Sequence, residues 1–204
     1  MLVLLLLQGE AAAQINHPYN EVGIYAVPDP EGCATAQIDV APMTPFTCWV
    51  VLTAPWNENL GRPVPTVAGI QFRLELPGDV MLLAVDYGAC VPPLTPMLPE
   101  FWTPCSTPVA AGRATLLGLT LMATTSGPAF VHMSPVRQSS PMLPDQMAFS
   151  DADGVWPDNI FAMHPISGSH DVPVFAINWD GDLSFCETVP LRAESFGGLK
   201  ALYR

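Results

Sequence analysis

Residues 67–87, VAGIQFRLELPGDVMLLAVDY, decide the fold. In the first half of this stretch, up to Leu76, apolar and polar residues alternate, which is the period of a strand with one buried and one solvent-facing side. Residues 77–79, Pro-Gly-Asp, have the composition of a tight turn. The almost continuous apolar run over 80–85 predicts a second strand, covered on both faces. Because two strands cannot bury their apolar faces alone, the stretch predicts a β-sandwich whose other strands come from flanking segments.

The composition fits one all-β domain. The chain has 204 residues, half of them hydrophobic, which is enough to bury a single core. Its 23 Pro and 15 Gly are spread along the chain, and this favours short strands joined by rigid turns over long helices. We therefore predict one Ig-like or jelly-roll β-sandwich domain over 14–204, with a long Pro-rich loop and a short C-terminal helix capped by Ser195.

Alternating and β-branched segments mark the other expected strands. We expect strands at 21–27, 46–54, 114–124, 129–136, 146–150, 171–178 and 182–186. Turn residues between the segments predict two hairpins, one formed by 114–124 with 129–136 and the other by 171–178 with 182–186.

The charge balance is strongly acidic. Seven Lys and Arg stand against 19 Asp and Glu, so the formal net charge is −12. Nucleic-acid binding requires a basic surface, which this composition does not provide. An anionic membrane would also repel the chain, so neither nucleic acid nor membrane is an expected partner.

The N-terminus, residues 1–13 (MLVLLLLQGEAAA), resembles the end of a secretory signal peptide. An apolar run is followed by a small-residue site, Ala11-x-Ala13, whose cleavage would release Gln14. A buried N-terminal strand is the alternative. The run is too short for membrane insertion, which takes about 20 apolar residues. We therefore expect a secreted protein, extracellular or periplasmic.

Five cysteines are candidates for disulfide bonds once export is accepted, because the compartments outside the cytosol are oxidising. Cys90 and Cys105 bracket a Pro-rich segment, and closing a loop of this length stabilises a fold by on the order of 3 kcal/mol. Cys33 and Cys186 would then connect the first strands to the last. Cys48 lies in an apolar run and is the expected free thiol. The sequence alone leaves other pairings open.

Three aspartates form a candidate calcium site: Asp151, Asp153 and Asp158. Their carboxylates are the hard oxygen ligands that Ca²⁺ prefers. An EF-hand is excluded, because Ala162 stands at position twelve from Asp151, where a bidentate Glu is needed. Ordinary turn chemistry is the alternative interpretation of the same residues. No other cofactor is expected.

Hydrolase signatures are absent from the sequence. There is no Gly-x-Ser-x-Gly elbow, no His-Glu-x-x-His pair and no Gly-rich phosphate loop. A catalytic triad could still assemble from distant residues, with His164 or His170 as the base, because triads are defined by geometry. The same two histidines provide too few ligands for a zinc site, so a surface loop is the simpler interpretation.

The segment from Cys90 to Cys105 is the leading candidate for a binding surface. It lies within 90–108, whose six prolines predict an extended loop that cannot form a central strand. It carries Met97, Phe101 and Trp102, and apolar groups held rigid by proline bind with a small entropic cost. A lid that buries these residues over one end of the sandwich is the alternative. Trp56 and Trp156, both flanked by turn residues, present the same choice.

The order of the apolar segments resembles that of cohesin-like modules of secreted bacterial proteins. The resemblance rests on segments 46–52, 67–76, 80–88, 112–123 and 179–185, and it includes no catalytic signature. Two features depart from that pattern: Leu76-Pro77 where Tyr-Asp is usual, and the segment bracketed by cysteines. The resemblance implies a jelly-roll sandwich that binds partner modules or surfaces and does not catalyse.

These observations predict a secreted, non-catalytic binding or adhesion module. Its expected partner is another protein, a polysaccharide or a second copy of the chain. Two alternatives remain open at this stage: an exported hydrolase with a site at one end of the sandwich, and a structural subunit of an extracellular assembly.

Overall fold

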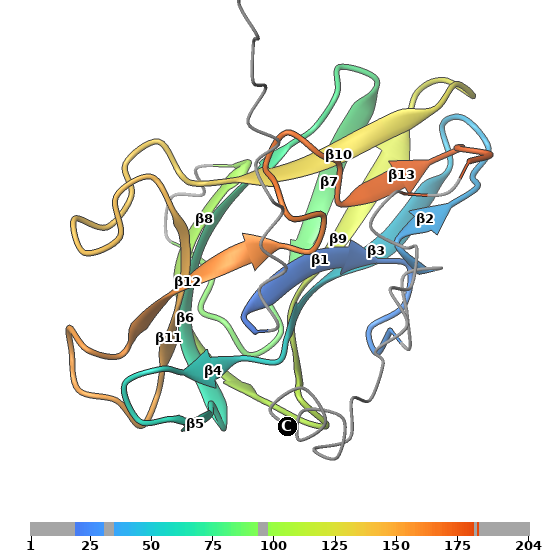
Figure 1. Cartoon of the computed structure of the whole chain (residues 1–204). Helices are drawn as coiled ribbons and strands as arrows, with labels where there is room; N and C mark the ends of the chain where they lie inside the picture. Colours follow the sequence, from blue (N-terminus) through green and yellow to red (C-terminus); the bar gives the residue numbers. More distant parts are fainter. Residues whose placement is uncertain (1–18, 31–34, 94–97, 182, 184–204) are drawn as a thin grey trace, which may run out of the picture.

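The computed structural model describes residues 19–30, 35–93, 98–181 and 183, and in this part of the chain all regular elements are strands (Figure 1). The all-β prediction is confirmed. The strands are β1 (Glu21–Tyr25), β2 (Gln37–Ile38), β3 (Pro45–Thr53), β4 (Trp56–Asn57), β5 (Arg62–Pro63), β6 (Thr66–Glu75), β7 (Val80–Asp86), β8 (Glu100–Pro108), β9 (Arg113–Ala123), β10 (Ala129–Ser134), β11 (Met147–Asp151), β12 (Ile160–Pro165) and β13 (Phe175–Ile177).

Several predictions fall on residues outside the described ranges. They are the signal peptide remnant at 1–13, the Cys33–Cys186 pair, Met97 and the helix capped by Ser195. Within the described ranges, no helix has the length and apolar character needed to cross a membrane.

The strands form two layers around one core. In the first layer β3 pairs with β1 and β9, and β9 pairs with β7; in the second, β6 pairs with β8, β10 and β11, and β11 pairs with β12. Parallel pairing of β1 with β12 joins the layers into one continuous path, β2-β13-β10-β6-β11-β12-β1-β3-β9-β7 (Figure 1). A separate ribbon of β4 and β5 lies beside this sheet.

Alternation in the strands supplies the core. Ile70, Phe72 and Leu74 on β6 are buried in the same cluster as Leu117 and Leu119 on β9. Full burial of one such side chain contributes about 1.5–3 kcal/mol. Because every second residue of β6 is committed to the core, the intervening residues are fixed on the opposite face of the sheet.

The stretch 67–87 contains the two expected strands and the expected turn, but β6 and β7 do not pair with each other. The turn at 77–79 carries the chain from one layer to the other. The prediction that both faces of 80–85 are covered is wrong: β7 ends the sheet path, and Met81 and Leu83 are 48% and 45% exposed. An apolar run therefore does not guarantee that both faces of a strand are covered.

The predicted partners of two other strands are also wrong. Strands β9 and β10 form where expected, but β9 pairs with β3 and β7, whereas β10 pairs with β6 and β13. In the last expected hairpin, β13 forms within 171–178 and pairs with β10 and β2. Most of its predicted partner, 182–186, lies outside the described residues. The local sequence pattern therefore predicted where strands form better than it predicted which strands pair.

Candidate binding groove

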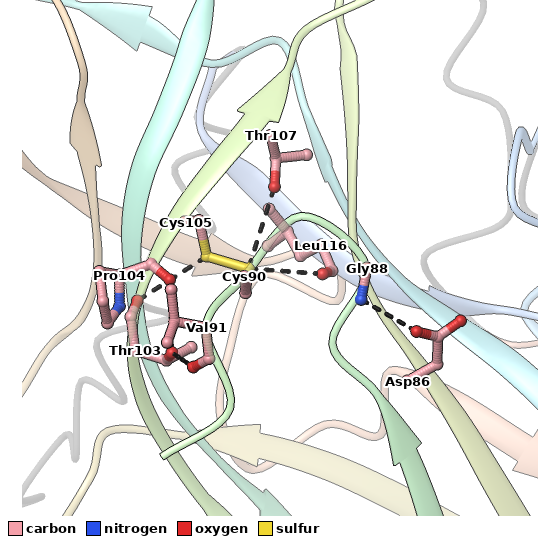
Figure 2. Close-up of a disulfide and its surroundings, with 9 residues drawn as sticks. All are labelled: Asp86, Gly88, Cys90, Val91, Thr103, Pro104, Cys105, Thr107 and Leu116. Atoms are coloured by element: carbon pink, nitrogen blue, oxygen red, sulfur yellow. Dashed lines mark hydrogen bonds between the residues drawn. A yellow bond between two sulfur atoms is a disulfide. The ribbon is translucent and has the colours of Figure 1, made fainter. Parts of the chain in front are cut away.

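The predicted disulfide between Cys90 and Cys105 is present, which confirms the pairing (Figure 2). Cys48 is buried and free, as expected. Burial raises the pKa of the Cys48 thiol to about 12, because a thiolate is poorly solvated in an apolar core. The thiol therefore stays protonated and unreactive at neutral pH.

The disulfide fastens residues 89–91 along the outer edge of β8. The amide of Val91 donates to the carbonyl oxygen of Pro104 at 2.8 Å, and the amide of Ser106 donates to that of Ala89 at 2.9 Å. The hydroxyl of Thr103 donates to the carbonyl oxygen of Val91 (Figure 2). Strand β8 is thus held between β6 on one side and this short segment on the other.

The prediction of a loop throughout 90–108 is therefore wrong for residues 100–108, which form β8. Its prolines are compatible with a strand because, among the described residues, β8 has β6 as its one full strand neighbour, and an edge position leaves some backbone amides unneeded. A shift in register between Val67 and Gly69 accommodates the pairing of the two strands.

Alternation along β8 separates two neighbouring aromatic residues. Phe101 is 2% exposed and stacks on Phe72 with ring centroids 4.9 Å apart, whereas Trp102 is 65% exposed. Phe101 is a core residue, which corrects its expected place on a recognition surface. Of this pair, only Trp102 is available to a partner.

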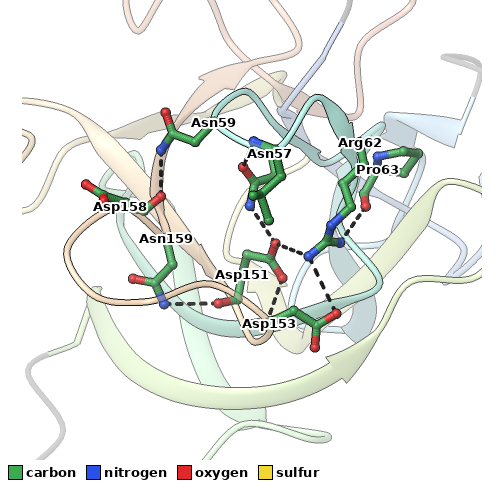
Figure 3. Close-up of polar contacts among 9 residues, drawn as sticks. Asn57, Asn59, Arg62, Pro63, Asp151, Asp153, Asp158 and Asn159 are labelled. Carbon is green, nitrogen blue, oxygen red and sulfur yellow. Dashed lines mark hydrogen bonds and ion pairs between the residues drawn. The ribbon is translucent and has the colours of Figure 1, made fainter.

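A charge network centred on the buried Asp151 lies at the predicted calcium site (Figure 3). The Asp151 side chain is fully buried, accepts a hydrogen bond from Asn57 Nδ2 at 2.8 Å, and lies 3.2 Å from Arg62 Nη2. The same guanidinium lies 3.5 Å from Asp153. Arg62 therefore supplies the positive charge that Ca²⁺ was expected to supply. In the described part of the chain, no group of three or more His, Cys, Asp or Glu could hold a metal ion.

The network also braces the loop from Asp151 to Asn159. The Asp151 carboxylate accepts the amide of Asp153 at 3.0 Å, and the Asp151 carbonyl accepts Asn159 Nδ2 at 3.0 Å. The carbonyl of Asp158 accepts Asn59 Nδ2 at 2.6 Å, which fastens the loop to the β4–β5 ribbon (Figure 3). This loop carries Trp156, which is 70% exposed.

Trp102 and Trp156 both line a groove of about 380 Å³ on the outer face of the second layer. We call it the Trp groove, with a β8 wall that carries Trp102 and a loop wall, residues 151–159, that carries Trp156. Its lining contains no Asp, Glu, Lys, Arg or His. Two rows of cross-strand neighbours form the floor: Trp102, Gln71 and Ala148 in one, and Pro104, Gly69, Ser150 and Ile160 in the other.

The floor is open because its central side chains are small. A Cβ added to Gly69 would lie 3.0 Å from the Ser150 hydroxyl oxygen, so a larger residue here would crowd β11. Gln71 is only 4% exposed and connects the floor to the loop beside it. Its Oε1 accepts the amide of Ser140 at 3.1 Å, and its Nε2 donates to the carbonyl of Gln146 at 3.4 Å.

The histidines of the described residues are not part of the groove lining. His170 Nδ1 is 2.9 Å from the carbonyl oxygen of Met133, and His132 Nδ1 is 3.3 Å from the carbonyl oxygen of His170. The hydrolase alternative required a cleft that holds His164 or His170 beside a serine and an aspartate. The lining of the Trp groove contains neither histidine.

Trp56 has a different environment from the two groove tryptophans. It is half-buried on β4 and stacks on Tyr19 with ring centroids 5.0 Å apart. Sequence reasoning singled out Trp102 and Trp156 separately, but it missed Gly69, Gln71 and Ser150 as their floor. The polar positions of the β6 alternation were the signal that could have located this face.

Comparisons with known proteins give a similarity in fold. No protein-family model and no curated protein matches the chain. A cohesin module from a Clostridium perfringens family 33 glycoside hydrolase matches with a TM-score of 0.45 at 9% identity, over 70% of this chain and 88% of that one. A non-cellulosomal cohesin from the archaeon Archaeoglobus fulgidus matches with a TM-score of 0.37 at 10% identity, over 57% and 74%. Both are modules of the family that the order of the apolar segments in this sequence resembles.

Proposed function

We propose that this chain is a secreted, non-catalytic binding module whose ligand occupies the Trp groove. The observation that carries the proposal is the pair of indole rings, on Trp102 and Trp156, that are 65% and 70% exposed and line one concave surface. Large apolar side chains left in water are a cost that ligand binding can recover.

Both walls are held in place before any ligand arrives. The disulfide and the amide of Val91 fasten β8, and the Asp151 carboxylate closes the loop that carries Trp156. Preordered side chains lose little conformational entropy on binding, and Trp is among the residues most enriched at binding hot spots. These two properties favour recognition by the groove.

The chemistry of the lining supports binding without catalysis. General acid–base catalysis needs a titratable side chain beside the reacting bond. The lining of the Trp groove offers hydroxyl, amide, aliphatic and indole groups, and no carboxylate, imidazole or amine. A ligand should therefore leave the groove chemically unchanged.

The disulfide between Cys90 and Cys105 supports export, because such bonds persist in oxidising compartments. Intact-mass measurement on protein recovered from the culture medium tests this part of the proposal. A chain that starts at Gln14 and contains the Cys90–Cys105 bond is expected. A cytosolic chain that retains Met1, with reduced thiols, would contradict it.

Retention on the immobilised chain tests the binding function. Wild type, the double variant Trp102→Ala/Trp156→Ala and the control Trp56→Ala are each exposed to the protein and polysaccharide fractions of the medium in which the protein is secreted. Wild type and the Trp56 variant should retain the same material, and the double variant should not. Eluted material should keep its original molecular size. Equal retention by all three proteins, or a reduction in size, would overturn the proposal.

A further inference from the structure

We infer that the Trp groove binds a neutral polysaccharide chain, with sugar rings stacked on Trp102 and Trp156; this inference rests on the proposed binding function. The charge of the groove favours an uncharged ligand. No residue of the lining is charged, while the chain as a whole has a formal net charge of −12. An anionic ligand would meet long-range repulsion and no compensating cation in the groove. A cationic ligand would find no carboxylate there.

The exposed indole rings have the chemistry to stack on sugar rings. An indole offers a broad, rigid, apolar face and a single N–H donor at its edge. The axial C–H groups of a pyranose form an apolar face of similar breadth, while its hydroxyls lie around the rim. Stacking the two faces removes apolar surface from water and leaves the sugar hydroxyls at the open side of the groove, where they remain hydrated.

The shape of the floor suits an extended chain. The row of Pro104, Gly69, Ser150 and Ile160 crosses four adjacent strands, β8, β6, β11 and β12. Three spacings between neighbouring strands give a length of roughly 14 Å, which is longer than one sugar ring. Small residues at the centre leave this path open, so a chain of several rings can lie across the strands. The ligand class is therefore an extended polymer.

The hydrogen-bonding groups of the groove are poorly suited to a peptide. An extended peptide gains affinity by adding a strand to a free sheet edge. The outer edge of β8 is occupied beside Pro104 and Ser106 by residues 89–91, through the hydrogen bonds of Val91 and Ser106. On the floor, both ends of the Gln71 amide are already hydrogen-bonded, and the Thr103 hydroxyl donates to Val91. Peptide N–H and C=O groups pressed onto this floor would lose water and find fewer partners than water provides.

Affinity electrophoresis of the full chain tests the inference directly. The gels contain one neutral polysaccharide each, namely hydroxyethylcellulose, mixed-linkage β-glucan or galactomannan, or one anionic polysaccharide, alginate or polygalacturonate. At least one neutral gel should retard the wild type, and the anionic gels should not. Because the ligand is uncharged, added NaCl should leave the retardation unchanged.

Variants connect the retardation to the two rings. Trp102→Ala and Trp156→Ala should each weaken binding roughly tenfold or more, and the double variant should migrate as in a gel without polysaccharide. Trp102→Phe should recover part of the affinity, because it keeps an aromatic face. Trp56→Ala, outside the groove, should bind as wild type does. Thermal unfolding confirms that each variant is folded.

Three outcomes would overturn the inference: no retardation in any neutral gel, retardation in the anionic gels alone, or equal retardation of wild type and the double variant. The proposed binding function fails separately. If the neutral gels give no retardation but a secreted protein is retained by wild type and lost in the double variant, the polysaccharide is wrong and the binding module stands. If neither ligand class depends on the two tryptophans, both are wrong.

Discussion

The two walls of the Trp groove are held by different kinds of interaction. The β8 wall is fastened covalently, by the disulfide between Cys90 and Cys105, and its Phe101 is anchored in the core. The loop wall has no covalent fastening among its described residues. It depends on the buried carboxylate of Asp151, the guanidinium of Arg62 and a set of hydrogen bonds.

This difference shows how one surface can be made rigid by two independent means. Reducing agents act on the β8 wall, and removal of a single charge acts on the loop wall. Perturbations of the two walls should therefore separate cleanly, and the exposed indole on each wall should matter little to the fold.

The largest effect is expected within the β8 wall itself, between neighbouring residues that face opposite ways. Phe101→Ala should lower the free energy of unfolding by about 3–5 kcal/mol, because it leaves a cavity beside Phe72. Trp102→Ala should change it by no more than about 0.5 kcal/mol, since the ring is exposed. Urea unfolding followed by circular dichroism measures both values. Similar losses in the two variants would contradict the inward and outward assignment.

The next effect concerns the loop wall. Arg62→Ala should destabilise the fold by about 3 kcal/mol, because it leaves the fully buried carboxylate of Asp151 without its cation. Asp153→Ala removes the exposed partner of the same guanidinium and should cost less than about 1 kcal/mol. Paired thermal and urea unfolding curves give this ratio. A larger loss for the Asp153 variant would refute the assignment of Asp151 as the centre of the network.

Removal of the covalent fastening should have a comparable or smaller effect. Cys90→Ser/Cys105→Ser should lower stability by at most about 3 kcal/mol, the loop-closure estimate for this separation. Dithiothreitol should lower the melting temperature of wild type and of Arg62→Ala more than that of the double serine variant, in which the expected Cys33–Cys186 bond would remain. Equal responses of wild type and the double serine variant would show that another disulfide, and not Cys90–Cys105, determines the stability of the fold.

The smallest effect is a contrast in reactivity. Cys48 is buried, and its pKa is raised to about 12, so at pH 8 almost no thiolate is present. Iodoacetamide should leave the Cys48 peptide unmodified in the folded chain and modify it in guanidinium chloride, as read by peptide mass spectrometry. Rapid modification of the native protein would mean that the strand around Cys48 opens readily.

Strand positions could be predicted from the sequence, because alternation in β6 and the apolar runs of β3 and β9 record burial locally. Which strands pair with one another could not be predicted from the sequence. The turn after β6 looks the same whether it joins paired strands or carries the chain between layers, and the choice depends on the packing of the whole core. For that reason the exposure of β7 and the pairing of β10 were predicted wrongly.

The groove illustrates the same limit at the level of a site. Trp102 and Trp156 were recognisable as candidates because large aromatic residues stood among turn-forming ones. Their common groove depends on the register that sets Gly69 opposite Ser150 and Pro104, which no local pattern encodes. The aspartates at 151 and 153 were correctly noticed as a cluster, but their partner Arg62 lies 89 positions from Asp151 in the sequence.

The most direct test of the proposed site is fluorine NMR of the chain labelled with 5-fluorotryptophan. The sequence contains five tryptophans, so each resonance can be assigned from single Trp→Phe variants. On titration with the neutral polysaccharide that retards the wild type, the resonances of Trp102 and Trp156 should shift together with one saturation curve, while that of Trp56 stays in place. Saturable binding that shifts Trp56 and leaves Trp102 and Trp156 unchanged would contradict the assignment of the Trp groove as the binding site.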